Sequence, residues 1–138
     1  MDVNKAIIIG NVGRDPEIRT TNGGKKIANF SIATSRKYNS GGEAKEITNW
    51  HRVVVMNEHL VKIVEAMVGK GTRVYVEGEI QHRDWEDKEG KKRSTTEIVL
   101  SYNGVLAIQG RGKRSDDSEA TEGKTGDAAK DFDDEIPF

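Results

Sequence analysis

The stretch ITNWHRVVVM, residues 47–56, combines a large aromatic ring and a cation at a spacing of two residues. Its apolar and polar residues alternate, which predicts a β-strand whose side chains point to opposite faces in turn. One face would carry Trp50, Arg52, Val54 and Met56 together. Burying an indole ring and a guanidinium side by side is costly, whereas an open surface of this kind can stack a flat base and pair with a phosphate. We therefore expect this strand to present a binding face for single-stranded nucleic acid.

Two further aromatic residues, Tyr38 and Trp85, stand in polar stretches that we expect to form hairpin arms near 39–45 and 82–93. Bases stack on such rings for about 1–3 kcal/mol each, while neighbouring cations follow the phosphates. The expected phosphate partners are Arg36, Lys37, Arg52, Arg73, Arg83, Lys91, Lys92 and Arg93. The alternative interpretation is that Trp50 and Tyr75 pack in a barrel or between subunits, Trp85 is an incidental arm residue, and the cations form an ordinary solvated surface.

Catalysis finds little support in the sequence. The three histidines, His51, His59 and His82, fall on different predicted elements and at no spacing that suits a metal pair. The stretch 69–72, Gly-Lys-Gly-Thr, precedes a predicted strand, whereas a phosphate loop follows a strand and opens a helix. We expect no catalytic residue, no metal and no cofactor.

Length and charge favour one small domain with a tail of different character. The 138 residues suffice for one modest core. Residues 1–110 contain 17 Lys and Arg against 14 Asp and Glu, and residues 111–138 contain 5 against 9, so a mildly basic body precedes an acidic tail. The chain has no cysteine, no secretory signal and no apolar run near the roughly 20 residues that span a bilayer, which predicts a cytoplasmic protein without a membrane role.

The hydropathy pattern predicts an all-β fold with one short helix. Strands are expected over Val3–Val12, Glu17–Thr21, Lys26–Tyr38, 47–56, Arg73–Ile80, Thr95–Leu100 and Val105–Ile108. A loop is expected over 39–42, and the inward-facing residues are predicted to be Ala28, Phe30, Ile32, Val74, Val76 and Ile80. The helix begins after the N-cap Asn57 and carries an apolar stripe of Leu60, Ile63, Val64, Met67 and Val68. A helix after the third barrel strand suggests a five-stranded OB-fold, a Greek-key barrel, over residues 1–110.

The end of the chain differs from the rest. Residues 111–130 contain too little apolar surface to offset the entropy of ordering, so we expect a disordered linker. Residues 131–138 join an acidic cluster to an apolar end. A solubilising tail does not need Ile and Phe at its tip, but a partner pocket with apolar walls and a basic rim does. The predicted protein-interaction tip is Asp133, Asp134, Glu135, Ile136, Pro137 and Phe138.

Motifs along the whole chain resemble the bacterial single-stranded DNA-binding protein family. They are VNKAIIIGNVGRDPEIR, NFSIATS, WHRVVV, KGTRVYVEGEI, TTEIVL and the ending DDEIPF. The resemblance implies a homotetramer of OB-folds, in a bacterial nucleoid, that wraps single-stranded DNA without sequence preference. It also implies a tail that recruits replication, recombination and repair proteins.

Carried over by position, the stacking residues of this family fall on Tyr38, Trp50 and Trp85, with Tyr38 in place of a frequent tryptophan. Met56 stands where an aromatic is often found, which implies a softer thioether contact with the base. His51, on the strand face opposite Trp50, would serve a subunit contact. The linker is much shorter than is usual in the family, which limits the reach of the tip.

Two other functions are compatible with the same residues. An OB-fold of the cold-shock type would use the same rings to bind single-stranded RNA, although the DDEIPF ending favours the DNA-binding family. A protein-only adaptor would use the sheet as an oligomer interface and the tail as bait, and its Trp50 and Trp85 would be irrelevant to oligonucleotides.

Overall fold

The fold is that of a computed structural model, in which residues 1–110 are described. The predicted linker (111–130) and the interaction tip (131–138) lie outside the described residues. The elements are β1 (Ala6–Val12), β2 (Glu17–Thr20), β3 (Lys26–Ser40), β4 (Glu43–Val55), α1 (Glu58–Met67), β5 (Arg73–Glu86), β6 (Lys92–Leu100) and β7 (Val105–Gly110).

Five strands close into a barrel. β1 pairs with β3, β3 with β4, β4 with β6, β6 with β5, and β5 returns to β1. All these pairs are antiparallel except β4–β6, which is parallel over three residue pairs beginning at Val53–Ile98. β2 adds to the edge of β3, and β7 adds to β5. The all-β class with one helix and the five-stranded OB-fold barrel are confirmed.

The core fills the barrel and extends to the helix at one end. Alternate residues of the strands point inward, so Ala28, Phe30 and Ile32 are all buried, as predicted. The helix begins at the predicted N-cap, since the Asn57 side-chain oxygen accepts hydrogen bonds from the backbone N–H groups of His59 (2.9 Å) and Leu60 (3.4 Å).

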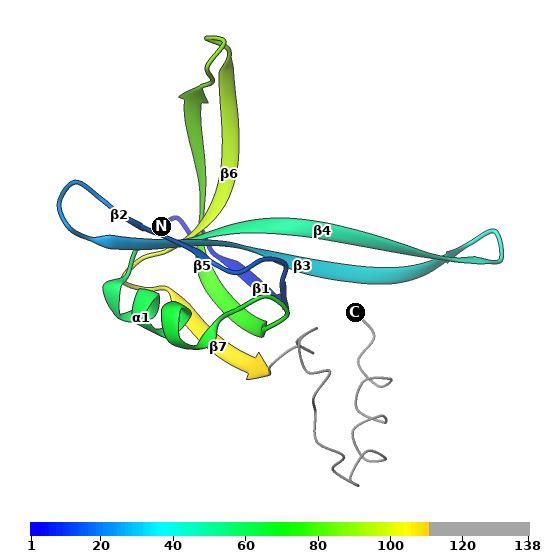
Figure 1. Cartoon of the computed structure of the whole chain (residues 1–138). Coiled ribbons are helices and arrows are strands. Elements are labelled where there is room, and N and C mark those ends of the chain that lie inside the picture. Colours follow the sequence, from blue (N-terminus) through cyan, green and yellow to red (C-terminus); the bar gives the residue numbers. More distant parts are fainter. Residues whose placement is uncertain (111–138) are drawn as a thin grey trace, which may run out of the picture.

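Two strand pairs continue beyond the barrel as hairpin arms (Figure 1). The first arm joins β3 to β4 through the turn Gly41–Gly42, where both glycines have a positive φ (60° and 82°). The second joins β5 to β6, and its turn contains Gly90, also at positive φ. Outside the barrel both faces of each arm are exposed, so neither arm contributes to the core.

Several strand bounds differ from the prediction, since β1 begins at Ala6 and not at Val3, and β4, β5 and β6 extend into the arms as far as Glu43, Glu86 and Lys92. Three further details of the prediction are wrong, and the arms explain two of them. The predicted loop 39–42 is only the Gly41–Gly42 turn, because ladder pairing continues to the Ser40–Glu43 pair. Ile80 was expected inside but is 41% exposed, because β5 leaves the core after Gly78 and runs on into the second arm.

The third error concerns the helix. Met67, predicted on its apolar stripe, is half exposed, while Val61, which was not predicted, is buried. The buried face is therefore centred on Leu60, Val61 and Val64. Among residues 1–110, no helix has the length and apolar character that crossing a membrane requires.

Candidate nucleic-acid interface

Trp50 lies on β4 where the first arm leaves the barrel, and its side chain is 61% exposed. Part of its ring packs against Gly13, in the loop after β1. A Cβ atom at Gly13 would lie only 2.2 Å from Cζ3 and 2.8 Å from Cη2 of Trp50. The missing side chain therefore creates the space that the indole ring occupies. The ring is supported on the Gly13 side and remains accessible elsewhere, which is the state in which a tryptophan can stack a base.

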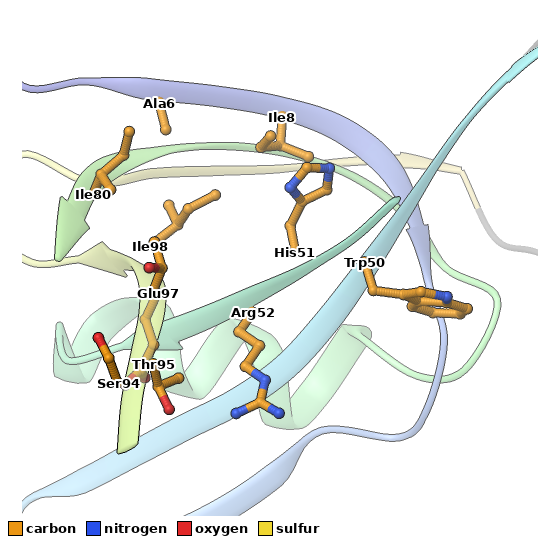
Figure 2. A pocket seen from close by; sticks show the side chains of 11 residues that line it. Ala6, Ile8, Trp50, His51, Arg52, Ile80, Ser94, Thr95, Glu97 and Ile98 are labelled. Atoms are coloured by element: carbon orange, nitrogen blue, oxygen red, sulfur yellow. The ribbon is translucent and has the colours of Figure 1, made fainter. Parts of the chain in front are cut away.

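A groove of about 490 Å³ lies next to Trp50, between the two arms. β4 and β6 are paired only at their carboxyl ends, so the residues that precede these ends diverge. Arg52 of β4 and the polar residues Ser94 and Thr95 of β6 line the polar side of the groove, and Figure 2 shows them below β4. Arg52 is exposed and has no ion pair among residues 1–110, so its guanidinium can pair with a phosphate in the groove.

The same groove has an apolar side on the opposite face of β4. It contains Ala6, Ile8, His51, Ile80 and Ile98, which Figure 2 shows above the strand. His51 points to this side because it alternates with Trp50 and Arg52. Its Nε2 lies 2.8 Å from the hydroxyl oxygen of Thr34, so the ring is oriented by a hydrogen bond.

The first arm separates the remaining predicted residues of its hairpin. Residues paired across an antiparallel ladder share a face, and alternate pairs share the same one. Lys37, paired with Glu46, shares the face of Trp50, which is paired with Ala33. Tyr38, paired with Lys45, and Arg36, paired with Ile47, are on the opposite face. A ligand on the Trp50 face can therefore reach Lys37 directly, but must curl around the arm to reach Tyr38 and Arg36.

The second arm positions Trp85 beside several polar groups. The indole Nε1–H donates a hydrogen bond to the Thr95 hydroxyl oxygen at 2.8 Å, and the ring remains 41% exposed. Arg83 and Arg93 are on the same face of the arm as Trp85. Arg83 forms an ion pair with Glu97 (2.9 Å). The hydrogen bond from Trp85 fixes the edge of the ring and leaves its face open.

The turn of the second arm is organised by Asp87. Its Oδ1 accepts hydrogen bonds from the backbone N–H groups of Glu89 (3.0 Å) and Lys91 (2.9 Å), and its Oδ2 pairs with Arg93 (2.9 Å). These interactions favour the charged form, Arg93 most strongly, and hold the pKa of the Asp87 carboxyl below its ordinary value. Arg93 therefore has a structural partner that a phosphate would have to displace.

The other predicted residues differ in their availability. Lys92 is exposed and has no ion pair in the described part of the chain, whereas Lys91 approaches Glu89 at 4.0 Å.

Arg73 is half-buried at the start of β5, and burial lowers its pKa, although its guanidinium stays charged at neutral pH. β5 runs from Arg73 at its barrel end into the second arm, so the structure does not bring this cation together with Trp85. Met56, 47% exposed, lines a second groove at the carboxyl end of β4.

Gly13 and Thr95, which contact the rings of Trp50 and Trp85, could not be predicted from the sequence. No local pattern marks them, because Gly13 reads as a turn residue and Thr95 as a strand residue, and each meets its ring only through the fold. In residues 1–110 no three His, Asp or Glu side chains gather in a way that could hold a metal ion.

The comparisons with known proteins agree with this geometry. The model of the single-strand binding protein family matches residues 3–108. A single-stranded DNA-binding protein of Rickettsia felis is 46% identical over an alignment 148 positions long, which covers 99% of this chain and 97% of the relative. One of Rhizobium meliloti is 52% identical over 114 residues, covering 80% and 66% of the two chains. A solved structure of the Plasmodium falciparum SSB in complex with ssDNA matches with a TM-score of 0.73 and 40% identity, covering 78% of this chain and 96% of that one. The chain therefore belongs to the single-strand binding protein family.

Proposed function

We propose that this protein binds single-stranded DNA without sequence preference and protects it during replication, recombination and repair. The observation that carries the proposal is the exposed Trp50 ring in a groove between two hairpin arms, next to Arg52, which forms no ion pair with any residue of the described range 1–110. Bases stack on Trp50 and Trp85, and the strand curls over the first arm to reach Tyr38. The phosphates pair first with Arg52, Lys37 and Lys92, which have no ion pair among residues 1–110.

This mode of binding predicts how affinity depends on conditions. Each phosphate that a cation neutralises releases counterions, so affinity falls as salt rises. Every base has a flat face, so stacking does not discriminate between sequences. Duplex DNA binds poorly, because its base faces are already stacked on one another.

We also propose that four copies assemble into a homotetramer. Ile7 and Ile9 point outward from β1, and they are 56% and 42% exposed. β1 pairs with β3 only at Asn11 and Val12, so the edge of β1 before these residues has no strand partner on that side within residues 1–110. An open strand edge and an exposed apolar row are features that association with another copy would cover. The apolar side of the first groove, with His51, would contribute to the same contact.

The tail proposal is supported by the sequence. Residues 131–138 combine carboxylates with Ile136 and Phe138 at the end of an acidic segment, a combination suited to a partner pocket with a basic rim. We propose that this tip recruits replication, recombination and repair proteins. This role, together with the bacterial relatives, fits a nucleoid-associated protein of the cytoplasm.

Competition between nucleic acids tests the proposed function. A labelled single-stranded DNA oligonucleotide is bound to the full chain and then displaced by unlabelled single-stranded DNA, duplex DNA or RNA of matched length. We expect single-stranded DNA of any sequence to compete best and duplex DNA to compete poorly. Equal competition by duplex DNA would contradict binding through stacking, and stronger competition by RNA would favour an RNA-binding function.

A further inference from the structure

A second groove, of about 530 Å³, lies beyond the first one at the carboxyl end of β4. It is formed by three segments that are distant in the sequence: the β2–β3 hairpin, the junction between β4 and α1, and the turn between β6 and β7. Its lining residues are Thr21, Lys25, Ile27, Met56, Asn57, Glu58, Ser101 and Tyr102. Its volume lies in the range of roughly 300–1,000 Å³ that small-ligand sites occupy, so it has room for a base.

Tyr102 is the most unusual residue of this groove. Its side chain is 95% exposed, so its ring is almost entirely uncovered. The turn that carries it is nevertheless well fixed. The Gly104 backbone N–H donates to the Ser101 carbonyl at 3.1 Å, and Gly104 packs so closely on Leu100 that a Cβ atom would lie 2.8 Å from the Leu100 Cα. A rigid turn thus presents an aromatic ring to solvent, at no cost in core packing.

The groove continues the face of β4 that carries Trp50. Trp50, Arg52, Val54 and Met56 alternate along the strand, so their side chains point to the same side. Met56 keeps its place in this row, because its backbone N–H donates to the Leu100 carbonyl at 2.9 Å, just beyond the last β4–β6 pair. At about 3.3 Å per residue, Met56 lies roughly 20 Å from Trp50 along the strand. A polynucleotide bound at Trp50 and running along β4 would reach the second groove.

The charges of the groove suit one nucleotide unit. Lys25 is exposed and has no ion pair among the described residues, so it can pair with a phosphate. Its neighbour Lys26 is instead paired with Glu65 of the helix at 3.3 Å. Glu58, the one carboxylate that lines the groove, belongs to the first turn of α1. A phosphate would therefore lie toward Lys25, and the base toward Tyr102 and Met56.

We propose that Tyr102 and Lys25 complete the base contact expected at Met56, so that a base of the bound strand lies between the Tyr102 ring and the Met56 thioether while Lys25 pairs with its phosphate. This proposal rests on the proposed binding of single-stranded DNA and extends its path across the barrel. Met56 supplies only a soft apolar contact. Tyr102, from a different part of the chain, supplies the flat ring that position 56 lacks.

Variants of Tyr102 in the full chain test this base contact. The probe is a fluorescein-labelled oligothymidylate long enough to cover both grooves, titrated at several salt concentrations. Loss of one stacked base corresponds to an affinity about 5- to 150-fold lower, so Tyr102→Ala should weaken binding by at least about fivefold, without changing the salt dependence. Tyr102→Phe keeps the ring and should bind like the unmodified protein. Because the side chain is 95% exposed, both variants should retain the thermal unfolding midpoint of the parent.

The adjacent lysines provide a matched pair. Lys25→Ala should reduce the slope of log K against log salt by about 0.7, the value for one phosphate contact on a single strand. Lys26→Ala removes the same charge from a side chain that is paired with Glu65, and should leave the slope unchanged.

Photocrosslinking gives a direct readout. With 5-iodouracil in place of thymine, irradiation should yield an adduct at Tyr102 that mass spectrometry identifies. Normal affinity of Tyr102→Ala and no adduct at Tyr102, in a protein whose binding still depends on Trp50, would overturn this base contact and leave the proposed function intact. Tighter binding by Tyr102→Ala would mean that another segment occupies the groove, which also contradicts the base contact. Absence of oligothymidylate binding by the parent protein would refute the proposed function itself.

Discussion

The position of the Trp50 ring depends on a residue 37 places earlier in the chain, because the ring occupies the space that a side chain at Gly13 would fill. Gly13→Ala should displace the ring and weaken binding of single-stranded DNA, by up to the 1–3 kcal/mol that a stacked base contributes. Fluorescence anisotropy with a labelled oligonucleotide measures the change. Gly110→Ala is a suitable control, since a Cβ atom there would meet nothing within 4 Å. Unchanged affinity of Gly13→Ala would show that the ring does not need this support.

Two arginines near the first groove, Arg52 and Arg83, differ in whether they form an ion pair in the described part of the chain. Arg52 has none in the described part of the chain, whereas Arg83 is paired with Glu97, whose side chain is only 12% exposed. Arg52→Ala should therefore reduce the slope of log K against log salt by about 0.7. Arg83→Ala should reduce it by less, because a phosphate must compete with Glu97 for this cation. Titrations at four or five salt concentrations measure both slopes, and a larger effect of Arg83→Ala would contradict this ranking.

For single residues, the sequence predicted well which strand face a side chain occupies, but it did not predict which other side chains it contacts. The alternation of 47–56 was sufficient to place Trp50 and Arg52 on one strand face, because side-chain direction in a strand is a local property. It could not predict that Gly13 supports Trp50, that Thr95 binds Trp85, or that Asp87 holds Arg93, because these contacts depend on strand register and on the fold.

The first groove exists because two hairpin arms extend from the barrel and diverge from one another. Their existence was predictable from polar alternating stretches around glycine-rich turns, but their length was not. Polar residues such as those of 81–86 can form either a loop or an exposed ladder, and tertiary pairing decides between the two. The same uncertainty explains why Ile80 was expected inside the barrel and is found at the root of an arm.

The tip of the second arm should respond to pH through Asp87. Its carboxyl pKa in the folded chain is lower than its ordinary value of 3.8, so the charged form stabilises the turn. This contribution is fully present above about pH 3.8 and is lost as the pH falls through the lower folded value. Hydrogen exchange read out by NMR should therefore show the protection of the Glu89 and Lys91 amides, which bond Asp87, falling at strongly acidic pH relative to amides of the barrel core.

Asp87→Asn offers the matching variant at neutral pH. It keeps the shape of the side chain but removes the charge that pairs with Arg93. We expect faster exchange at the turn, at a pH where the parent is protected, and little change in global stability, since the arm lies outside the core. Equal protection in the variant and the parent would show that backbone pairing alone maintains the turn.

For the whole molecule, the exposed row on β1 predicts assembly. Ile9 is paired in register with Tyr75, and Ile7 with Glu77, so the apolar row has a polar neighbour. The Tyr75 hydroxyl donates a hydrogen bond to the Glu77 carboxylate, and Lys5 pairs with the same carboxylate at 3.1 Å. Together these interactions lower the pKa of Glu77, the hydrogen bond from Tyr75 most strongly. A partner surface that covers Ile7 and Ile9 would therefore meet side chains that are already paired.

Ile9→Glu should convert the proposed tetramer to smaller species, because it places a charge in a contact that is repeated in every copy. Sedimentation velocity at several concentrations measures this change, and circular dichroism checks that the barrel is intact. Met67→Glu makes the same change at a half-exposed helix position and should leave the assembly unaltered. A monomeric parent protein would contradict the proposed tetramer, although not the proposed DNA binding.

The central claim is that an open ring on the barrel wall stacks an unpaired base, and the fluorescence of Trp50 tests it most directly. The chain has only two tryptophans, so Trp85→Phe leaves Trp50 as the single indole reporter while preserving a ring on the second arm. Single-stranded oligonucleotides should quench this fluorescence to saturation, whereas duplex DNA of the same length should leave it nearly unchanged. Saturable binding without quenching, or equal quenching by the duplex, would contradict the account.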